Sequence, residues 1–347
     1  MGCDVLFDVL TPKQALFFWA VGRELKSRGV EASYVTRSYE QLDWVERDLG
    51  LEALKIGRFG EESLEGKMVA STERQAALIG IVRELRPKIT ASSGSIELCR
   101  VSYGLSVKHY LASDTSHSPV NRVCVPLSDL VATPFFIPIK EWKRWATPST
   151  RFLRYRALDP IAWMRRLDYR RALTSHRRYV LVRPPERKAS YLQVKGLEDT
   201  STLVRNLRAQ YDGEVLVVSR YRDDAYLLAQ GSEKGVKLLT EPTLLLPLIA
   251  GAEAVFSGGG TTAQEAALLG VPTFTFYPGE MPAVHRFLMR RGLLREVNAD
   301  ERSITAALEL ARDSGFRNNL EDRARRLRDA MEDPAIALAE ALAAGLR

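Results

Sequence analysis

The sequence predicts an α/β fold made of two consecutive doubly wound domains, each with a parallel sheet covered by helices on both faces. Three observations predict this fold. Short apolar segments typical of buried strands alternate with segments of helix length. The alternation breaks near the middle of the chain and then starts again. The length, 347 residues, suits two domains of about 100–200 residues each.

The first domain is expected over residues 1–140. Its first strand, at 3–10, leads into a long helix with Pro12 in the first turn and Gly29 at the end, which are favoured positions for proline and glycine. Pro87 ends a second helix. The further strands predicted in this domain lie at 32–36, 89–93, 107–113 and 130–133.

Residues 141–177 have little strand character and are interpreted as an interdomain connection with a surface helix. The second domain is expected over 178–315, followed by C-terminal helices over 316–347. Its predicted strands lie at 178–182, 214–219, 236–239, 254–257 and 273–277. This is the GT-B layout, in which two Rossmann-like domains face a central cleft and ligands bind at the carboxyl ends of the strands.

Composition excludes several classes of protein. The chain is 46% hydrophobic and 27% charged, as in a soluble globular protein. No apolar run reaches the ~18–20 residues of a membrane span, and Asp4 and Asp8 in the first strand argue against a signal peptide. Three scattered cysteines and four scattered histidines form neither a disulfide framework nor a metal-ligand cluster. We expect a cytoplasmic protein with no metal or other cofactor.

The densest motif is Gly258-Gly259-Gly260-Thr261-Thr262, which joins a buried strand to a helix. Glycines let the backbone approach a ligand closely, and the helix N-terminus offers N–H groups and a positive dipole end to a phosphate. We expect Thr261 and Thr262 to cap the helix and donate to ligand oxygens, and Glu265 to accept from ribose hydroxyls. The alternative is a tight joint whose glycines serve packing alone. No Gly-Lys-Ser/Thr follows, so the motif is not a Walker loop.

This segment resembles the donor-binding motif of GT-B glycosyltransferases, among them the peptidoglycan lipid-linked GlcNAc transferase, and of the non-hydrolysing UDP-N-acetylglucosamine 2-epimerases. The resemblance implies that residues 258–261 face a diphosphate and that Glu265 binds a ribose. The runs that begin at Thr11, Ser113 and Arg183 resemble a largely archaeal family of unknown function, number 354, which is grouped with the GT-B superfamily. Where that family tends to have Arg-His-Gly-Gly, this chain has Gly57-Arg58-Phe59-Gly60.

Further candidates on the nucleotide-sugar side follow other strands of the second domain. Arg183 follows the first of them and would clamp a diphosphate bidentately, with a structural salt bridge as the alternative. Ser190 and Arg220 are weaker candidates of the same kind. Glu280 and His285 follow the last predicted strand, in the loop that contacts the sugar in the related enzymes.

The first domain offers candidates for acceptor binding and proton transfer. Thr11 and Lys13 open its first helix and are placed on the acceptor or phosphate side, with an exposed lysine at a helix start as the alternative for Lys13. Asp114 and His117 follow a strand and form the candidate catalytic pair, because a histidine titrates near neutrality and a carboxylate can orient it. A loop histidine with a structural role is the alternative. The sequence has no Asp-x-Asp pair, so no metal-bridged diphosphate is expected.

Basic residues concentrate in the segment 140–178. It has twelve Lys or Arg against three acids, a local excess larger than the net charge of +7 for the whole chain, so the remainder is slightly acidic. Its aromatic residues are Trp142, Trp145, Phe152, Tyr155, Trp163 and Tyr169. One hypothesis is that this segment docks on an anionic inner membrane face, where a lipid-linked acceptor would lie. A linker with buried aromatics is the alternative, and nucleic acid is not an expected partner because no reader motif is present.

The sequence favours a metal-independent glycosyltransferase that moves a sugar from a nucleotide-diphosphate sugar, such as a UDP-sugar, to an acceptor held by the first domain. Asp114 and His117 would supply its base. One alternative is an epimerase that acts on the nucleotide sugar itself. The other is a nucleotide-sugar-binding protein without catalysis.

Overall fold

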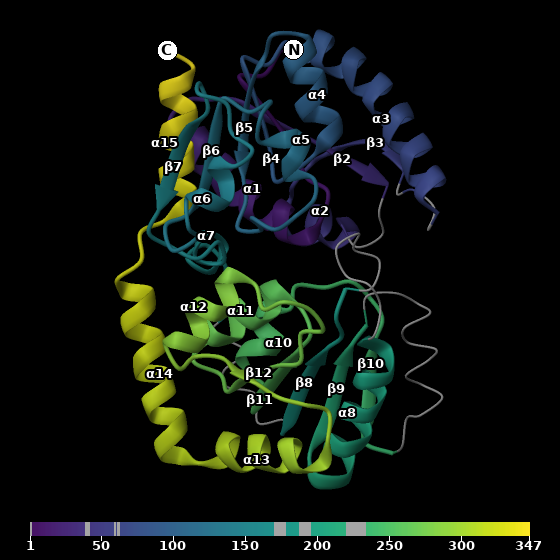
Figure 1. Ribbon diagram of the computed structural model, residues 1–347, viewed down its shortest axis with the longest axis vertical. Coiled ribbons are helices and arrows are strands. Elements are labelled where there is room, and N and C mark those ends of the chain that lie inside the picture. The colour runs from purple at the N-terminus through teal and green to yellow at the C-terminus, as the bar shows by residue number, and fades with distance from the viewer. Residues whose placement is uncertain are drawn as a thin grey trace. The chain divides into compact units, whose positions relative to one another are not determined.

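The computed structural model describes residues 2–38, 42–58, 60, 63–169, 178–186, 196–219 and 234–347, with the backbone alone for 196–199. The chain forms two compact units (Figure 1). The N-terminal unit combines Met1–Arg166 with Glu332–Arg347, and the C-terminal unit comprises Leu167–Met331. The end of the chain therefore returns to the first unit.

Within the described residues, the N-terminal unit has a seven-stranded sheet in which all adjacent strands are parallel. Its order is β3-β2-β1-β4-β5-β6-β7, so the direction of winding reverses between β1 and β4. The strands are β1 (Val5–Asp8), β2 (Ala32–Ser38), β3 (Leu54–Arg58), β4 (Ile89–Ser92), β5 (Lys108–Ala112), β6 (Leu130–Pro134) and β7 (Arg151–Tyr155). In such sheets, ligands bind at the carboxyl ends of the strands, at the point of reversal.

Helix α1 (Pro12–Ser27) follows β1 as the sequence predicts. The Thr11 hydroxyl accepts a hydrogen bond from the Gln14 N–H, Pro12 occupies the first turn, and Gly29 follows the helix with a φ of 71°. The last helix of the chain, α15 (Pro334–Gly345), packs against α1 and β7. The other helices of the unit are α2 (Asp43–Leu49), α3 (Leu64–Leu85), α4 (Ile96–Gly104), α5 (Asn121–Cys124), α6 (Lys140–Lys143) and α7 (Ile161–Met164).

The C-terminal unit repeats this architecture with a parallel sheet of six strands in its described part. The order β10-β9-β8-β11-β12-β13 reverses between β8 and β11. The strands are β8 (Tyr179–Arg183), β9 (Glu214–Val218), β10 (Val236–Leu239), β11 (Ala254–Ser257), β12 (Thr273–Thr275) and β13 (Arg295–Glu296). The helices are α8 (Gly196–Gln210), α10 (Leu246–Ala250), α11 (Gly260–Leu269), α12 (Ala283–Arg290), α13 (Glu301–Arg312) and α14 (Ser314–Asp329).

Each face of the second sheet has its own core. Phe256 and Phe274 point to the face covered by α8 and α13, where their rings stack with centroids 5.1 Å apart. Val255 points to the opposite face, covered by α10 and α11. Because side chains alternate along a strand, Ser257 and Thr275 lie on the face of α11. This alternation brings two hydroxyls beneath the start of that helix.

The division of the chain differs from the predicted boundaries. The predicted connection at 141–177 contributes its residues up to Arg166 to the N-terminal unit, and Arg151–Tyr155 form the edge strand β7. An edge strand leaves charged side chains in water, which explains why its pattern does not resemble that of a buried strand. The predicted C-terminal helices are also divided, because α14 belongs to the C-terminal unit and α15 to the N-terminal unit.

Across the ranges that the structure describes, none of the helices combines the length and the apolar character needed to cross a membrane.

Candidate functional sites

The glycine turn connects β11 to α11 at the switch point of the second sheet. Helix α11 begins at Gly260, its N-cap residue is Gly259, and its first turn contains no acidic residue. The Ser257 hydroxyl accepts a hydrogen bond from the Gly259 N–H at 3.2 Å. A Cβ added to Gly260 would meet no atom of the described residues within 4 Å. The positive end of α11 therefore lies at the carboxyl edge of the sheet.

Arg183 and Gly258, predicted separately, are brought together at this turn. The Gly258 N–H donates to the Arg183 carbonyl at 2.9 Å, and a Cβ on Gly258 would lie 2.7 Å from the Pro185 ring nitrogen. Arg183 is 8% exposed, and its Nη1 donates to the carbonyls of Val218 (2.8 Å) and Ser219 (2.9 Å). Gly258 is thus required by packing, and the Arg183 guanidinium is anchored at the end of β9.

The threonines of the motif are not caps, contrary to the prediction. Because α11 starts at Gly260, Thr261 and Thr262 are the second and third residues of its first turn. Thr275 adds a group that the sequence did not single out, a fully buried hydroxyl with no hydrogen-bond partner among the described residues. Thr275 pairs in register with Ser257 of β11, which lies directly before the glycines. This position in the sheet could have identified Thr275 as a candidate.

The remaining predicted residues of this unit lie in contrasting environments. Glu265 is 4% exposed within α11, and a carboxylate buried to that extent requires hydrogen-bond donors around it. Glu280 is exposed and forms an ion pair with Arg286 at 3.5 Å. His285 is fully buried, with its Nδ1 3.3 Å from the Met281 sulfur. The predicted residues Ser190 and Arg220 lie outside the described residues.

A second site lies at the carboxyl edge of the first sheet, where Lys13 contacts two carboxylates. Its ammonium forms an ion pair with Asp114, which follows β5, and another with Asp159, which follows β7, at 2.9 Å. The Tyr155 hydroxyl donates to Asp159 at 2.6 Å and the Thr115 hydroxyl donates to Asp114 at 2.9 Å. We call Lys13, Asp114, Asp159 and Tyr155 the lysine–carboxylate cluster.

Burial and neighbouring charges together set the protonation of this cluster. Burial lowers the pKa of Lys13, but Asp114 and Asp159 outweigh that effect and hold it above its usual value. Burial raises the pKa of the Asp159 carboxyl, and Lys13 only partly opposes that rise. Burial also raises the pKa of Tyr155. The cluster combines one ammonium with two carboxylates, and this excess of negative charge would repel a phosphate. The cluster therefore suits the hydroxyl groups of a neutral acceptor better.

Sequence reasoning identified Lys13 and Asp114 but not Asp159 or Tyr155. Tyr155 ends strand β7 and Asp159 follows it. The sequence pattern did not predict this strand, because residues 141–177 were interpreted as a connection. His117, the predicted partner of Asp114, is exposed on the loop after β5, and the catalytic role of the pair stays a prediction. Thr11 caps α1.

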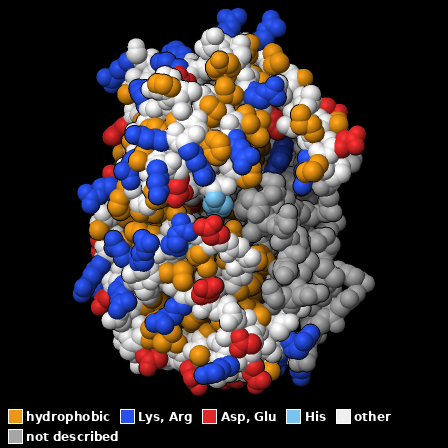
Figure 2. Space-filling model, viewed as in Figure 1, with side chains coloured by type: hydrophobic (Ala, Val, Ile, Leu, Met, Phe, Trp, Pro, Cys, Tyr) orange, Lys and Arg blue, Asp and Glu red, His pale blue; other side chains and the backbone are white. Residues whose placement is uncertain are grey.

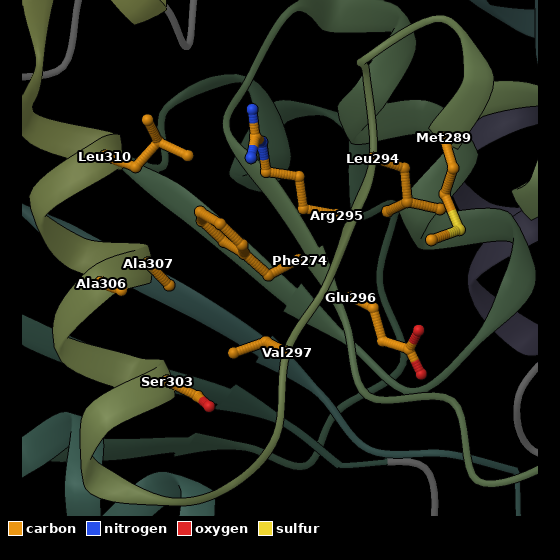
Figure 3. A pocket seen from close by; sticks show the side chains of 10 residues that line it. All are labelled: Phe274, Met289, Leu294, Arg295, Glu296, Val297, Ser303, Ala306, Ala307 and Leu310. Carbon is orange, nitrogen blue, oxygen red and sulfur yellow. The ribbon is translucent and has the colours of Figure 1, made fainter.

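No group of three or more His, Cys, Asp or Glu side chains suited to a metal ion occurs among the residues described. A pocket of about 600 Å³ lies in the C-terminal unit between α13 and the β12–β13 edge (Figure 3). Phe274 lines it, so the pocket lies on the face of the sheet opposite to α11. None of the predicted site residues that the structure describes lines this pocket.

Comparison with known families identifies the chain. The family described as Protein of unknown function (DUF354) matches residues 3–335. The chain belongs to this family. A relative from Methanocaldococcus jannaschii, Uncharacterized protein MJ0665, is 22% identical over 311 residues, which cover 85% of this chain and 88% of the relative.

Solved structures show which fold this DUF354 member has. It resembles a UDP-GlcNAc 2-epimerase from Neisseria meningitidis bound to UDP-GlcNAc, with a TM-score of 0.74, 15% identity and 98% of each chain covered. It also resembles the glycosyltransferase of kitacinnamycin, with a TM-score of 0.64, 13% identity and 100% of each chain covered. At these identities the likeness establishes the fold, and the prediction of a GT-B-type α/β fold is confirmed.

Proposed function

We propose that this protein is a GT-B-type glycosyltransferase that binds a nucleotide-diphosphate sugar at the glycine turn of its C-terminal unit. The observation that carries the proposal is the position of the turn. The N-terminus of α11 lies beside the end of β8, where the sheet order reverses, and no acidic residue lies in its first turn. Open α/β sheets bind ligands at this point, and a helix N-terminus there favours phosphate.

Each part of the nucleotide sugar has a candidate partner. The first-turn N–H groups of α11 and the hydroxyls of Thr261 and Thr262 would hold the diphosphate, and Arg183 would add positive charge. Glu265 would accept hydrogen bonds from the ribose. These contacts require no metal ion, although a metal-independent reaction stays a prediction.

The lysine–carboxylate cluster would act on the acceptor. In the transfer, an acceptor hydroxyl oxygen bonds to the anomeric carbon of the sugar, the bond from that carbon to the diphosphate breaks, and the nucleoside diphosphate leaves. Asp114, held by Lys13 and Thr115, would take the proton that the hydroxyl loses. Asp159 would hold Lys13 in position.

A thermal-shift screen with UDP, GDP, CDP, dTDP and their sugar conjugates tests the binding step. A ligand at 100 times its Kd adds about 2.7 kcal/mol of stability, which raises the unfolding temperature by several degrees. Gly260→Val should unfold at the temperature of the wild type without ligand and lose the ligand shift, because its side chain would fill the space before α11. Gly80→Val is the matched control, at an exposed glycine of α3 whose Cβ also meets no atom within 4 Å in the part of the chain that is described. If no nucleotide shifts the wild type, the proposal is wrong.

A 2-epimerase acting on the nucleotide sugar is the second candidate, favoured by the two carboxylates of the lysine–carboxylate cluster and by the fold likeness to UDP-GlcNAc 2-epimerases. The products distinguish the two reactions. An epimerase returns a sugar with inverted C2 that is still attached to its nucleotide, with no acceptor added. A transferase releases free nucleoside diphosphate, which chromatography separates from the nucleotide sugar.

A further inference from the structure

A basic surface covers the last part of the first sheet, over α6 and β7. Between residues 140 and 156 every exposed charged side chain is cationic. The acid in this stretch, Glu141, is half-buried and accepts a hydrogen bond from the Ser116 hydroxyl. We define the basic face by its exposed cations: Arg122, Lys140, Lys143, Arg144, Arg154 and Arg156. Figure 2 shows Lys and Arg side chains gathered over this part of the unit.

Aromatic groups lie among these cations. Trp145 is half-buried, and the guanidinium groups of Arg122 and Arg144 lie 5.4 and 5.0 Å from its ring centroid. Phe135 is also half-buried, with Arg156 6.0 Å from its ring centroid and Arg154 donating to its carbonyl. The basic face therefore presents partly exposed rings held between positive charges.

The structure also corrects the aromatic part of the sequence hypothesis. Trp142, Tyr155 and Trp163 are buried in the N-terminal unit, so they are core residues and cannot contact a partner. Of the aromatics counted in the sequence, Trp145 is the one that the described contacts place between two arginines. The basic face depends mainly on charge, with a smaller apolar contribution.

We propose that the basic face docks the N-terminal unit on an anionic membrane surface. Cations near such a surface attract it by about 1 kcal/mol each, and a tryptophan ring favours the headgroup level. A bilayer contacts one face of a protein, which suits a surface whose exposed charged side chains between residues 140 and 156 are all cationic. This inference stands apart from nucleotide-sugar binding, which concerns the C-terminal unit.

Vesicle sedimentation of the full chain tests the inference. The probes are vesicles of phosphatidylcholine alone and of phosphatidylcholine with phosphatidylglycerol, at low and at high salt. We expect binding to the anionic vesicles alone, weakened by salt because exposed charges are screened. The variant Lys140→Gln/Lys143→Gln/Arg144→Gln should bind roughly a hundredfold more weakly, since about 1 kcal/mol per cation is about fivefold.

The matched control also removes three positive charges, but from another part of the surface. Arg302→Gln/Arg317→Gln/Arg326→Gln changes three exposed arginines of α13 and α14 and should bind as the wild type does. All substituted side chains are exposed, and unchanged thermal unfolding shows that each variant is folded. Three results would overturn the inference: no binding at low salt, equal losses in both triple variants, or tighter binding of a duplex nucleic acid that competes with the vesicles.

Discussion

At the scale of single residues, the lysine–carboxylate cluster shows what each charged side chain contributes to stability. Lys13 is 24% exposed, and its two carboxylate partners are 6% exposed each. Buried carboxylates are tolerated only when a cation or hydrogen-bond donors compensate their charge. The stability of this edge of the sheet should therefore depend on the ammonium.

Lys13→Met retains the apolar stem and removes that ammonium. We expect the free energy of unfolding to fall by roughly 2–4 kcal/mol near neutral pH, because breaking a buried ion pair leaves uncompensated charge. The Asp159 pKa, already raised by burial, should rise further without Lys13. A carboxyl with a raised native pKa stabilises the fold below its unfolded pKa, and this stabilisation is lost as pH rises through the native value.

Urea unfolding of Lys13→Met at about pH 5 and about pH 8 measures this effect, with the larger loss expected at the higher pH. The double variant Lys13→Met/Asp159→Asn serves as the control. It should recover part of the lost stability, since one of the two negative charges is removed with the ammonium. A Lys13→Met loss that is the same at both pH values would contradict this account.

At the scale of elements, the sequence predicted the central strands better than the edges. Buried strands such as β1 and β11 are apolar along most of their length, so their segments are recognisable without an alignment. Strand β7 has the sequence RFLRY, with arginines at its exposed positions, and β13 has two residues, both exposed. An edge strand is defined by its pairing with a neighbouring strand. The local sequence pattern carries no information about that pairing. Asp159 was missed for this reason.

The joint between β11 and α11 contains glycines with two different roles. Gly258→Ala should cost about 1–3 kcal/mol, because the new methyl group would lie against the Pro185 ring and backbone at 2.7 Å, and overpacking a rigid neighbour costs about that much. Urea unfolding measures the loss. Gly260→Ala is the matched control and should keep full stability, since its Cβ meets none of the described atoms within 4 Å. Equal stability of both variants would contradict the packing role of Gly258.

At the scale of the whole molecule, the chain closes its first unit with its last helix. The sequence predicted two doubly wound halves, but not this return, because the helical pattern of 334–345 is the same whichever unit it covers. In the structure, α15 packs against α1 and β7, and Lys108 donates to the Gly345 carbonyl at 2.8 Å. The stability of the N-terminal unit therefore depends on residues that follow the whole C-terminal unit in sequence.

Leu338→Ala tests this dependence, because Leu338 is fully buried in α15. Removing a buried leucine side chain costs about 2–5 kcal/mol, a large part of the stability of a domain. Amide hydrogen exchange should show weaker protection in β1 and β4, whereas β8 and β11 keep theirs. Ile336→Ala, at a position of the same helix that is 37% exposed, should leave both units unchanged. If Leu338→Ala instead lowered protection in β8 and β11 alone, α15 would stabilise the C-terminal unit, and its assignment to the N-terminal unit would be wrong.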